Sequence, residues 1–195
     1  WHPSHERSNT ASDLSCISLA WCPVANSGTI SSWQRAQSDA GTGSAGADNA
    51  LAVLCFQFGR YLLISSSRPG RLPANLQGIW NNKMNPSWDS KYTTNINTEM
   101  NYWPGESGNL SDCVEPLITM VKELKDQGSR VAREHYGASG WVFHQNTDLW
   151  RVAAPMDGPC WGTFTVGGAW LCNQIYDHYR YNVDLDYLRE IYPLL

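Results

Sequence analysis

Hydrophobic residues follow a helical spacing after Asp48, where they recur three and four positions apart over several turns. Asp48 belongs to the residue types that cap helix N-termini, and the run Arg68-Pro69-Gly70 is typical of a helix end. We therefore predict one helix that starts after Asp48 and stops before Arg68. The apolar positions that define it are Leu51, Leu54, Cys55, Phe58, Tyr61 and Leu62.

A second apolar stripe at helical spacing begins at Val114. Asp112 followed by Glu115 gives it a capping pattern at its start. We expect a separate short helix to follow, capped by Ser129 and closed by Gly137, because glycine readily adopts the left-handed conformation that ends helices.

Two further helices are expected near the end of the chain, over residues 169–181 and, capped by Asp184, over residues 185–195. The segment 162–168 could instead form a short pair of strands. About five helices joined by long connections predict an all-α fold, in which helices stack as a toroid or barrel with binding loops at one end.

The segment 73–103 differs from the helical segments, because it has few aliphatic residues and no single period. It contains seven asparagines, three tryptophans and two tyrosines. Amides supply paired donors and acceptors, while aromatic rings supply rigid apolar area. This combination favours loops that bind a polar ligand with an apolar face, such as a sugar.

Composition excludes some classes of partner. A formal net charge of −4 argues against nucleic acid, because phosphate binding requires a basic surface. The sequence contains no run of 18 or more apolar residues, which argues against a membrane-spanning helix. The six cysteines have no metal-binding spacing, and buried free thiols are expected at Cys55, Cys113 and Cys172. Residues 1–47 are rich in small polar residues and predict an irregular, linker-like segment.

Several longer motifs occur in a fixed order between residues 48 and 195. They are FGRYLLISSSRPG, PANLQGIWN, NINTEMNYWP, NLSDCVEPL, HQNTDLWR and VGGAW. In these motifs the chain resembles glycoside hydrolase family 95, the inverting α-L-fucosidases, which also include some α-L-galactosidases.

The resemblance implies that residues 48–195 are the N-terminal part of an (α/α)6 barrel. Five predicted helices correspond to about the first half of its twelve, so the remainder of the barrel is expected to lie outside this chain. The implied reaction hydrolyses terminal α-L-fucosyl groups, α-1,2-linked ones foremost, with water and no cofactor. The implied partner is a fucosylated oligosaccharide or glycan, in an extracellular or periplasmic location.

Inverting hydrolysis needs a carboxylic acid on one face of the sugar and an activated water on the other, with the two catalytic groups about 6.5–9.5 Å apart. By resemblance, Asn95 and Asn97 hold that water, while the acid and its partner aspartate lie beyond residue 195. An extended backbone would place both amides on one side. The alternative from spacing alone is that they cap the following turn. Glu99 and Glu106 are interpreted as making structural hydrogen bonds, without donating the proton.

Further residues are candidates for contacts with the substrate. His144, Asn146 and Asp148 could bind sugar hydroxyls, although a core position for His144 is an equal alternative. Trp80, Trp88, Trp103 and Trp150 could form pocket walls, although tryptophans more often pack in a core. The chain departs from the family pattern at Gln145, where many members have histidine, and at Thr165-Val166, where Trp-Pro is usual.

Two other functions remain open from the sequence. One is a carbohydrate-binding module or decayed homologue that holds a sugar without cleaving it. The other is an (α/α)6 enzyme of a different type, such as a glucoamylase-like hydrolase or a disaccharide phosphorylase.

Overall fold

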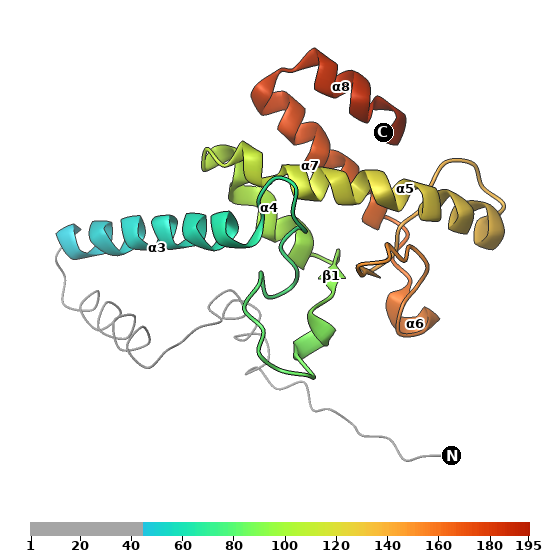
Figure 1. Ribbon diagram of the computed structural model, residues 1–195, viewed down its shortest axis with the longest axis horizontal. Coiled ribbons are helices and arrows are strands. Elements are labelled where there is room, and N and C mark those ends of the chain that lie inside the picture. The colour runs from blue at the N-terminus through green and yellow to red at the C-terminus, as the bar shows by residue number, and fades with distance from the viewer. Residues whose placement is uncertain (1–44) are drawn as a thin grey trace.

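A computed structural model describes residues 45–195 of the chain, and the regular secondary structure of this part is almost entirely helical (Figure 1). The all-α prediction is confirmed, and closure into a toroid stays a prediction. The irregular segment predicted over residues 1–47 lies outside the described residues, except that the first helix already begins at Ala45. The helices are α3 (Ala45–Ser66), α4 (Asn97–Ser107), α5 (Glu115–Tyr136), α6 (Pro159–Gly162), α7 (Gly167–Asn182) and α8 (Leu185–Ile191), with 3-10 turns η1 (Ser87–Ser90), η2 (Ser111–Cys113) and η3 (Tyr192–Leu194).

Helix α5 crosses the middle of the molecule and carries the largest share of the core. Its apolar stripe is buried at Leu117, Val121 and Leu124, as the spacing predicts. The predicted break at Ser129 is wrong, because α5 continues to Tyr136 as one helix of 22 residues and ends at Gly137 with a φ of 60°.

The predicted capping pattern ahead of α5 is also wrong. Asp112 lies inside η2, and Val114 occupies the N-cap of α5 without a side-chain capping hydrogen bond. Pro116 near the helix start removes one N–H that would otherwise need a partner, which lowers the need for a cap.

A chain of buried hydrogen bonds ties the Asn- and Trp-rich stretch to α3 and η2. The Ala74 N–H donates to Tyr102 Oη over 2.8 Å, and Ser67 Oγ donates to Cys113 O over 2.8 Å. Because the Ser67 proton points to Cys113, the 2.7 Å contact between Tyr102 Oη and Ser67 Oγ has the phenol as its donor. Each group in this chain therefore donates to the next: the Ala74 N–H to Tyr102, Tyr102 to Ser67, and Ser67 to the Cys113 carbonyl.

A two-residue antiparallel ladder joins two loops that are far apart in sequence. Strand β1 (Tyr92–Thr93) pairs with β2 (Asn146–Thr147), with Tyr92 opposite Thr147. The strand pair considered for residues 162–168 is not formed, because α6 ends at Gly162 and α7 begins at Gly167.

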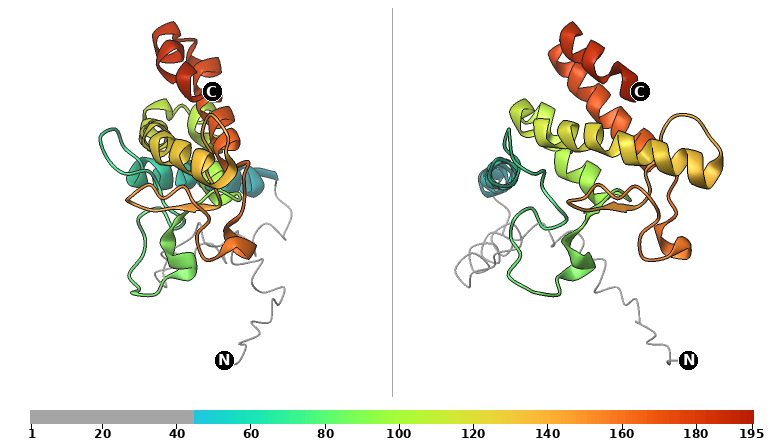
Figure 2. Two further views of the ribbon diagram at one scale, coloured as in Figure 1. Left: turned by 90° about the vertical axis from the view of Figure 1, so that its right-hand side faces the viewer. Right: turned by 45° about the vertical axis from the view of Figure 1, so that its right-hand side comes forward.

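Helices α7 and α8 lie at one end of the molecule, and the loops that carry η1 and α6 lie at the other end in every view (Figure 2). Asp184 caps α8 as predicted, with its Oδ1 accepting from the N–H groups of Asp186 and Tyr187. The C-terminal residues are held to the core by Trp141 Nε1, which donates to Leu194 O over 2.9 Å.

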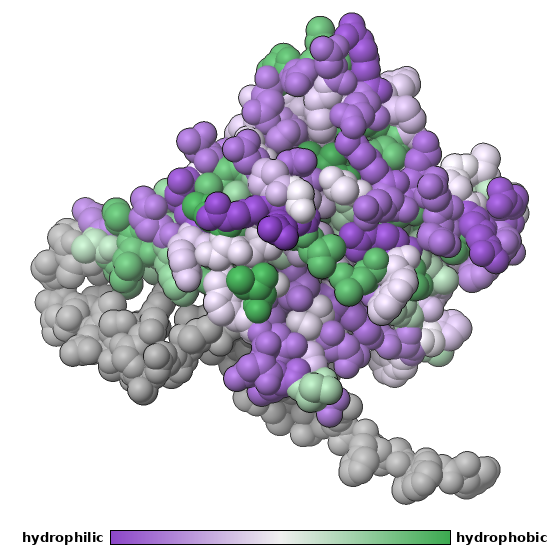
Figure 3. All heavy atoms as spheres, in the orientation of Figure 1, coloured by the Kyte–Doolittle hydropathy of each residue, from purple (hydrophilic) through white to green (hydrophobic). Residues whose placement is uncertain are grey.

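Helix α3 is less well covered than α5 by the described residues. Val53, Leu54, Phe56 and Tyr61 are each more than half exposed, and Figure 3 shows hydrophobic side chains on this helix at the left of the molecule. Cys113 is a buried free thiol as predicted, whereas the free thiols of Cys55 and Cys172 are only partly buried. None of the described helices is long and apolar enough to span a bilayer.

Candidate functional site

Asn95 and Asn97 lie in the turn that leads from β1 into α4. Asn95 is exposed, and Asn97 is the partly buried first residue of α4. Ile96 between them has φ −155° and ψ −1°, so the backbone across this motif is not the extended one that would place both amides on one side. The backbone turns at Ile96 because α4 begins at the next residue, Asn97.

The capping alternative for the two asparagines is not observed either. The N-cap position of α4 has no side-chain hydrogen bond. Neither Asn95 nor Asn97 makes a side-chain hydrogen bond to any residue in the described range 45–195. Two adjacent amides at a helix start therefore keep their donors and acceptors available.

Thr94, which is fully buried, fixes the turn that carries the asparagines. Its N–H donates to Gln145 O over 2.7 Å. Its Oγ1 lies 2.8 Å from His144 O and 2.9 Å from Gln145 O. The NINTEM and HQNTDLW motifs are thereby held side by side.

Gly167, the first residue of α7, allows a third segment to approach the same place. A Cβ at this position would lie 2.8 Å from Phe143 O, 2.9 Å from His144 O and 3.2 Å from Thr94 Oγ1. Backbone carbonyls cannot move aside as a flexible side chain can. The first glycine of VGGAW is therefore required by close packing between backbones.

His144 is fully buried, and both of its ring nitrogens have partners. The Phe164 N–H donates to Nδ1 over 3.2 Å, so the proton of the neutral ring is on Nε2, which lies 3.0 Å from Tyr136 Oη. Burial lowers the pKa of His144 and nearby His135 lowers it further, which favours the neutral ring. These contacts match the core alternative, with a backbone N–H and a phenol as the partners.

Asn146 and Asp148 occupy different environments. Asn146 is buried in β2, and its Oδ1 accepts from Thr93 Oγ1 over 2.6 Å. Asp148 is partly exposed, and its Oδ1 accepts from the N–H of Trp150 over 2.9 Å, which shapes the following turn. One carboxylate oxygen of Asp148 remains without a hydrogen bond to a described residue.

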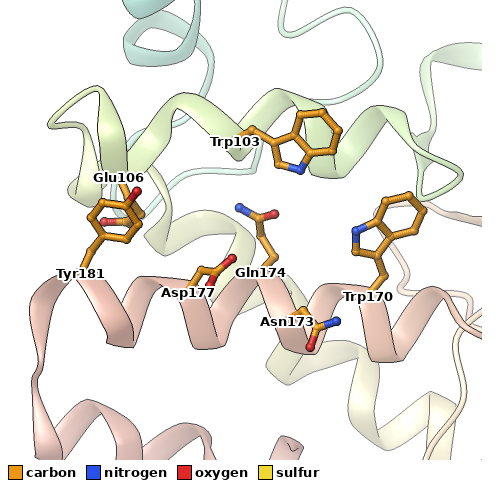
Figure 4. Close-up of a pocket in the computed structure, with 7 residues that line it drawn as sticks. All are labelled: Trp103, Glu106, Trp170, Asn173, Gln174, Asp177 and Tyr181. Atoms are coloured by element: carbon orange, nitrogen blue, oxygen red, sulfur yellow. The ribbon is translucent and has the colours of Figure 1, made fainter.

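A cavity of about 230 Å³ lies between α4 and α7 (Figure 4). Of the nine residues considered for catalysis or substrate contact, Trp103 alone lines it. We call it the α4–α7 groove; its lining residues are Trp103, Glu106, Trp170, Asn173, Gln174, Asp177 and Tyr181.

Comparison with known proteins identifies the family. The model of the glycosyl hydrolase family 95 catalytic domain matches residues 12–195. The chain belongs to glycosyl hydrolase family 95. The family 95 match begins at residue 12, so it extends further toward the N-terminus than the motifs in residues 48–195.

Curated relatives agree with this family 95 assignment. The chain is 49% identical over 150 residues to alpha-L-fucosidase 2 of Arabidopsis thaliana, a match that covers 76% of this chain and 18% of the relative. It is 40% identical over 145 residues to probable alpha-fucosidase A of Aspergillus niger, covering 73% of this chain and 18% of the relative. The chain therefore spans less than a fifth of the length of these relatives.

The three tryptophans predicted as pocket walls in this family 95 chain lie apart from the groove. Trp88 and Trp150 are 69% and 77% exposed. Trp80 is partly buried and packs against Tyr61, with ring centroids 6.2 Å apart. Trp103, also considered as a wall, does line the groove.

The two glutamates of the NINTEMNYWPGE segment behave differently. Glu106 makes the predicted structural hydrogen bonds, to Ser111 Oγ at 2.6 Å and His178 Nδ1 at 2.5 Å. The same prediction is wrong for Glu99, which is fully buried and whose carboxyl oxygens have no partner among the described residues. Burial raises the pKa of Glu99 to about 8, so its carboxyl group is largely protonated at pH 7.

Sequence reasoning missed the α7 side of the groove. Trp170, Gln174, Asp177 and Tyr181 recur three and four positions apart, so they share one helix face. That spacing was a usable signal, but the face mixes aromatic, amide and acidic residues and so lacks a simple apolar stripe. Within residues 45–195, no cluster of three or more His, Cys, Asp or Glu side chains could hold a metal ion.

Proposed function

We propose that this chain is part of the catalytic domain of an α-L-fucosidase that hydrolyses terminal α-1,2-linked L-fucosyl groups with inversion. The family and the names of the two relatives support the substrate class. The proposed roles of Asn95 and Asn97 are to hold and orient the attacking water through their side-chain amides.

The observation that carries this proposal is the free state of those two amides. The neighbouring hydroxyl groups of Thr93 and Thr94 are buried and paired, in contrast to these two amides. Amides that are kept out of the local network, at the start of a helix, are available to a water molecule or a sugar hydroxyl. The N-terminal end of α4 also carries a partial positive charge, which favours the developing hydroxide character of an attacked water.

Asparagine cannot remove a proton from water at neutral pH, so a carboxylate base and a carboxylic acid are also required. In our proposal both come from the remainder of the domain, because this chain spans only 18% of its relatives. Asp148, with one unpaired carboxylate oxygen, and the exposed rings of Trp88 and Trp150 would contact the sugar. His144 and Asn146 would act by holding the backbone beside the asparagine turn.

The test is a segment exchange in which this chain replaces the matching segment of the Arabidopsis relative. We expect the chimera to release fucose from 2′-fucosyllactose, and proton NMR to detect β-L-fucose first, as inversion of an α-linkage requires. Asn95→Ala and Asn97→Ala should each lower kcat by at least about 100-fold.

Asn82→Ala is the matched control, because Asn82 is an exposed asparagine of the same stretch. An active chimera in which Asn95→Ala and Asn97→Ala leave kcat unchanged would refute the assigned roles. Initial formation of α-L-fucose would refute inversion. The isolated chain is expected to show little turnover, so measurable turnover by it would contradict the need for outside carboxyl groups.

A further inference from the structure

The α4–α7 groove has the composition of a ligand site. Three aromatic rings, those of Trp103, Trp170 and Tyr181, stand around two carboxylates and two amides (Figure 4). Such rings offer flat apolar area, while the polar groups between them fix the orientation of a bound molecule.

Gln174 gives the strongest sign that the groove takes a polar molecule. Its side chain is only 9% exposed, it points between the two helices toward α4, and it makes no hydrogen bond to any residue within 45–195. Its amide atoms open onto the groove, so they can exchange hydrogen bonds with a molecule that enters it. A polar ligand in the groove therefore finds a free donor and a free acceptor at Gln174.

The charges around Gln174 restrict the kind of ligand. Glu106 and Asp177 disfavour an anion. A cation finds little free capacity at Glu106, whose oxygens already accept from Ser111, His178 and Asn182, and Asp177 is already paired with the cationic Arg180. A purely apolar ligand would leave the Gln174 amide unpaired. A neutral molecule with hydroxyl groups and one apolar face satisfies all three conditions.

Size and position narrow the assignment further. Pockets for drug-sized ligands have volumes of about 300–1,000 Å³, and the groove, at about 230 Å³, suits a smaller molecule. Trp103 follows Asn97 by six residues on α4, a separation of roughly 9 Å along the helix. The groove is therefore distinct from the asparagine turn, although both are built on the same helix.

We propose that the α4–α7 groove binds a neutral pyranose as a second carbohydrate site, separate from the Asn95–Asn97 turn. A hexose ring stacks one face on Trp103 or Trp170, and its hydroxyls exchange hydrogen bonds with the amides of Gln174 and Asn173 and donate to the Asp177 carboxylate. That the ligand is a sugar of a glycan rests on the proposed function. That the ligand is neutral and carries hydroxyl groups follows from the groove residues alone.

The test is a titration of the full 195-residue chain with lactose and, separately, with L-fucose, followed by NMR. At millimolar sugar we expect shifts in the indole N–H signals of Trp103 and Trp170 and in the side-chain amide of Gln174. Gln174→Met keeps the size of the side chain and removes its hydrogen bonds. It should weaken sugar binding by about tenfold while leaving the unliganded chain equally or more stable to urea.

Two controls make the outcome decisive. Trp161→Ala removes a tryptophan that is 77% exposed and outside the groove, and it should not change binding. Asn95→Ala should also leave groove binding intact. Sugar binding that survives Gln174→Met but is lost in Asn95→Ala would overturn the groove site and support the asparagine turn. The absence of any shift in the groove signals would overturn the proposal, and the segment exchange would still decide the proposed function.

Discussion

Thr93 Oγ1 donates a hydrogen bond of 2.6 Å to Asn146 Oδ1, and both residues are buried. They are 53 positions apart in sequence and stand on the paired strands β1 and β2, where Thr93 is opposite Asn146. The side-chain bond therefore adds to the backbone ladder and connects the asparagine turn with the HQNTDLW loop. Two short strands alone make a weak sheet, so this bond is important for keeping the loops in register.

Thr93→Val should destabilise the chain, because it leaves the buried Asn146 carbonyl oxygen without its donor. We expect a loss of about 1–3 kcal/mol in the free energy of unfolding, measured by urea denaturation. Thr93→Ser keeps the hydroxyl and is the matched control. Equal losses in both variants would mean that packing of the threonine methyl group, and not the hydrogen bond, is responsible.

Gly167→Ala should be destabilising by about 1–3 kcal/mol, because its Cβ would meet two backbone carbonyls. Gly59→Ala is the contrasting substitution, since Gly59 lies inside α3 and a Cβ there meets no described atom within 4 Å. Alanine is favoured over glycine in a helix by about 0.5–1 kcal/mol, so Gly59→Ala should stabilise. Thermal melts of the two variants should shift in opposite directions.

Glu99→Gln should change how stability depends on pH. Because burial raises the folded pKa of Glu99 to about 8, the carboxyl group is protonated in the folded state and ionised in the unfolded state between its ordinary pKa of 4.5 and pH 8. The unfolded state then binds fewer protons, so stability falls as pH rises through this window, by at most about 5 kcal/mol. Urea denaturation at several pH values should show this fall in the parent and a flatter curve for Glu99→Gln; parallel curves would contradict the buried, protonated carboxyl group.

Glu106→Gln should change the pH dependence of stability at acidic pH. Burial alone would raise the pKa of Glu106, but hydrogen bonds from His178, Ser111 and Asn182 outweigh it and lower the pKa. A lowered folded pKa gives stability that is present above the ordinary glutamate pKa of 4.5 and is lost as pH falls through the folded pKa.

We expect Glu106→Gln to be less stable than the parent by roughly 1–3 kcal/mol at pH 7 and to lose less stability on acidification. Glu134→Gln is the control, because Glu134 makes only an exposed pair with Arg130. Stability curves that keep a constant separation down to low pH would argue against the Glu106 network as the acid-sensitive element.

Local sequence patterns predicted the helices well where one face is uniformly apolar. The stripe through Leu117, Val121 and Leu124 identified α5, and Asp184 identified the start of α8. The false break at Ser129 arose because Gly128-Ser129 reads as a helix end. In the structure Gly128 is instead a close-packing position, where a Cβ would lie 2.7 Å from Val142 O. Such a tertiary contact cannot be detected from local propensity.

The candidate site was harder to predict, because its residues are defined by contacts between distant segments. The Asn95-x-Asn97 spacing would place both amides on one side only in an extended backbone, and the immediate start of α4 imposes a turn. His144 could be assigned to the core only when Phe164 and Tyr136 were seen beside its ring. The groove depends on how α7 lies against α4, which no pattern within either helix specifies.

The bond from Trp141 Nε1 to Leu194 O closes a loop of 53 residues. Closing a loop of this length costs on the order of 3–4 kcal/mol in chain entropy. The contacts that form when the loop closes must offset this cost. We therefore expect α8 and η3 to dock late in folding, after the collapse of α4, α5 and α7. Until Trp141 is packed in the core, this bond has no fixed donor, and α8 and η3 would remain undocked.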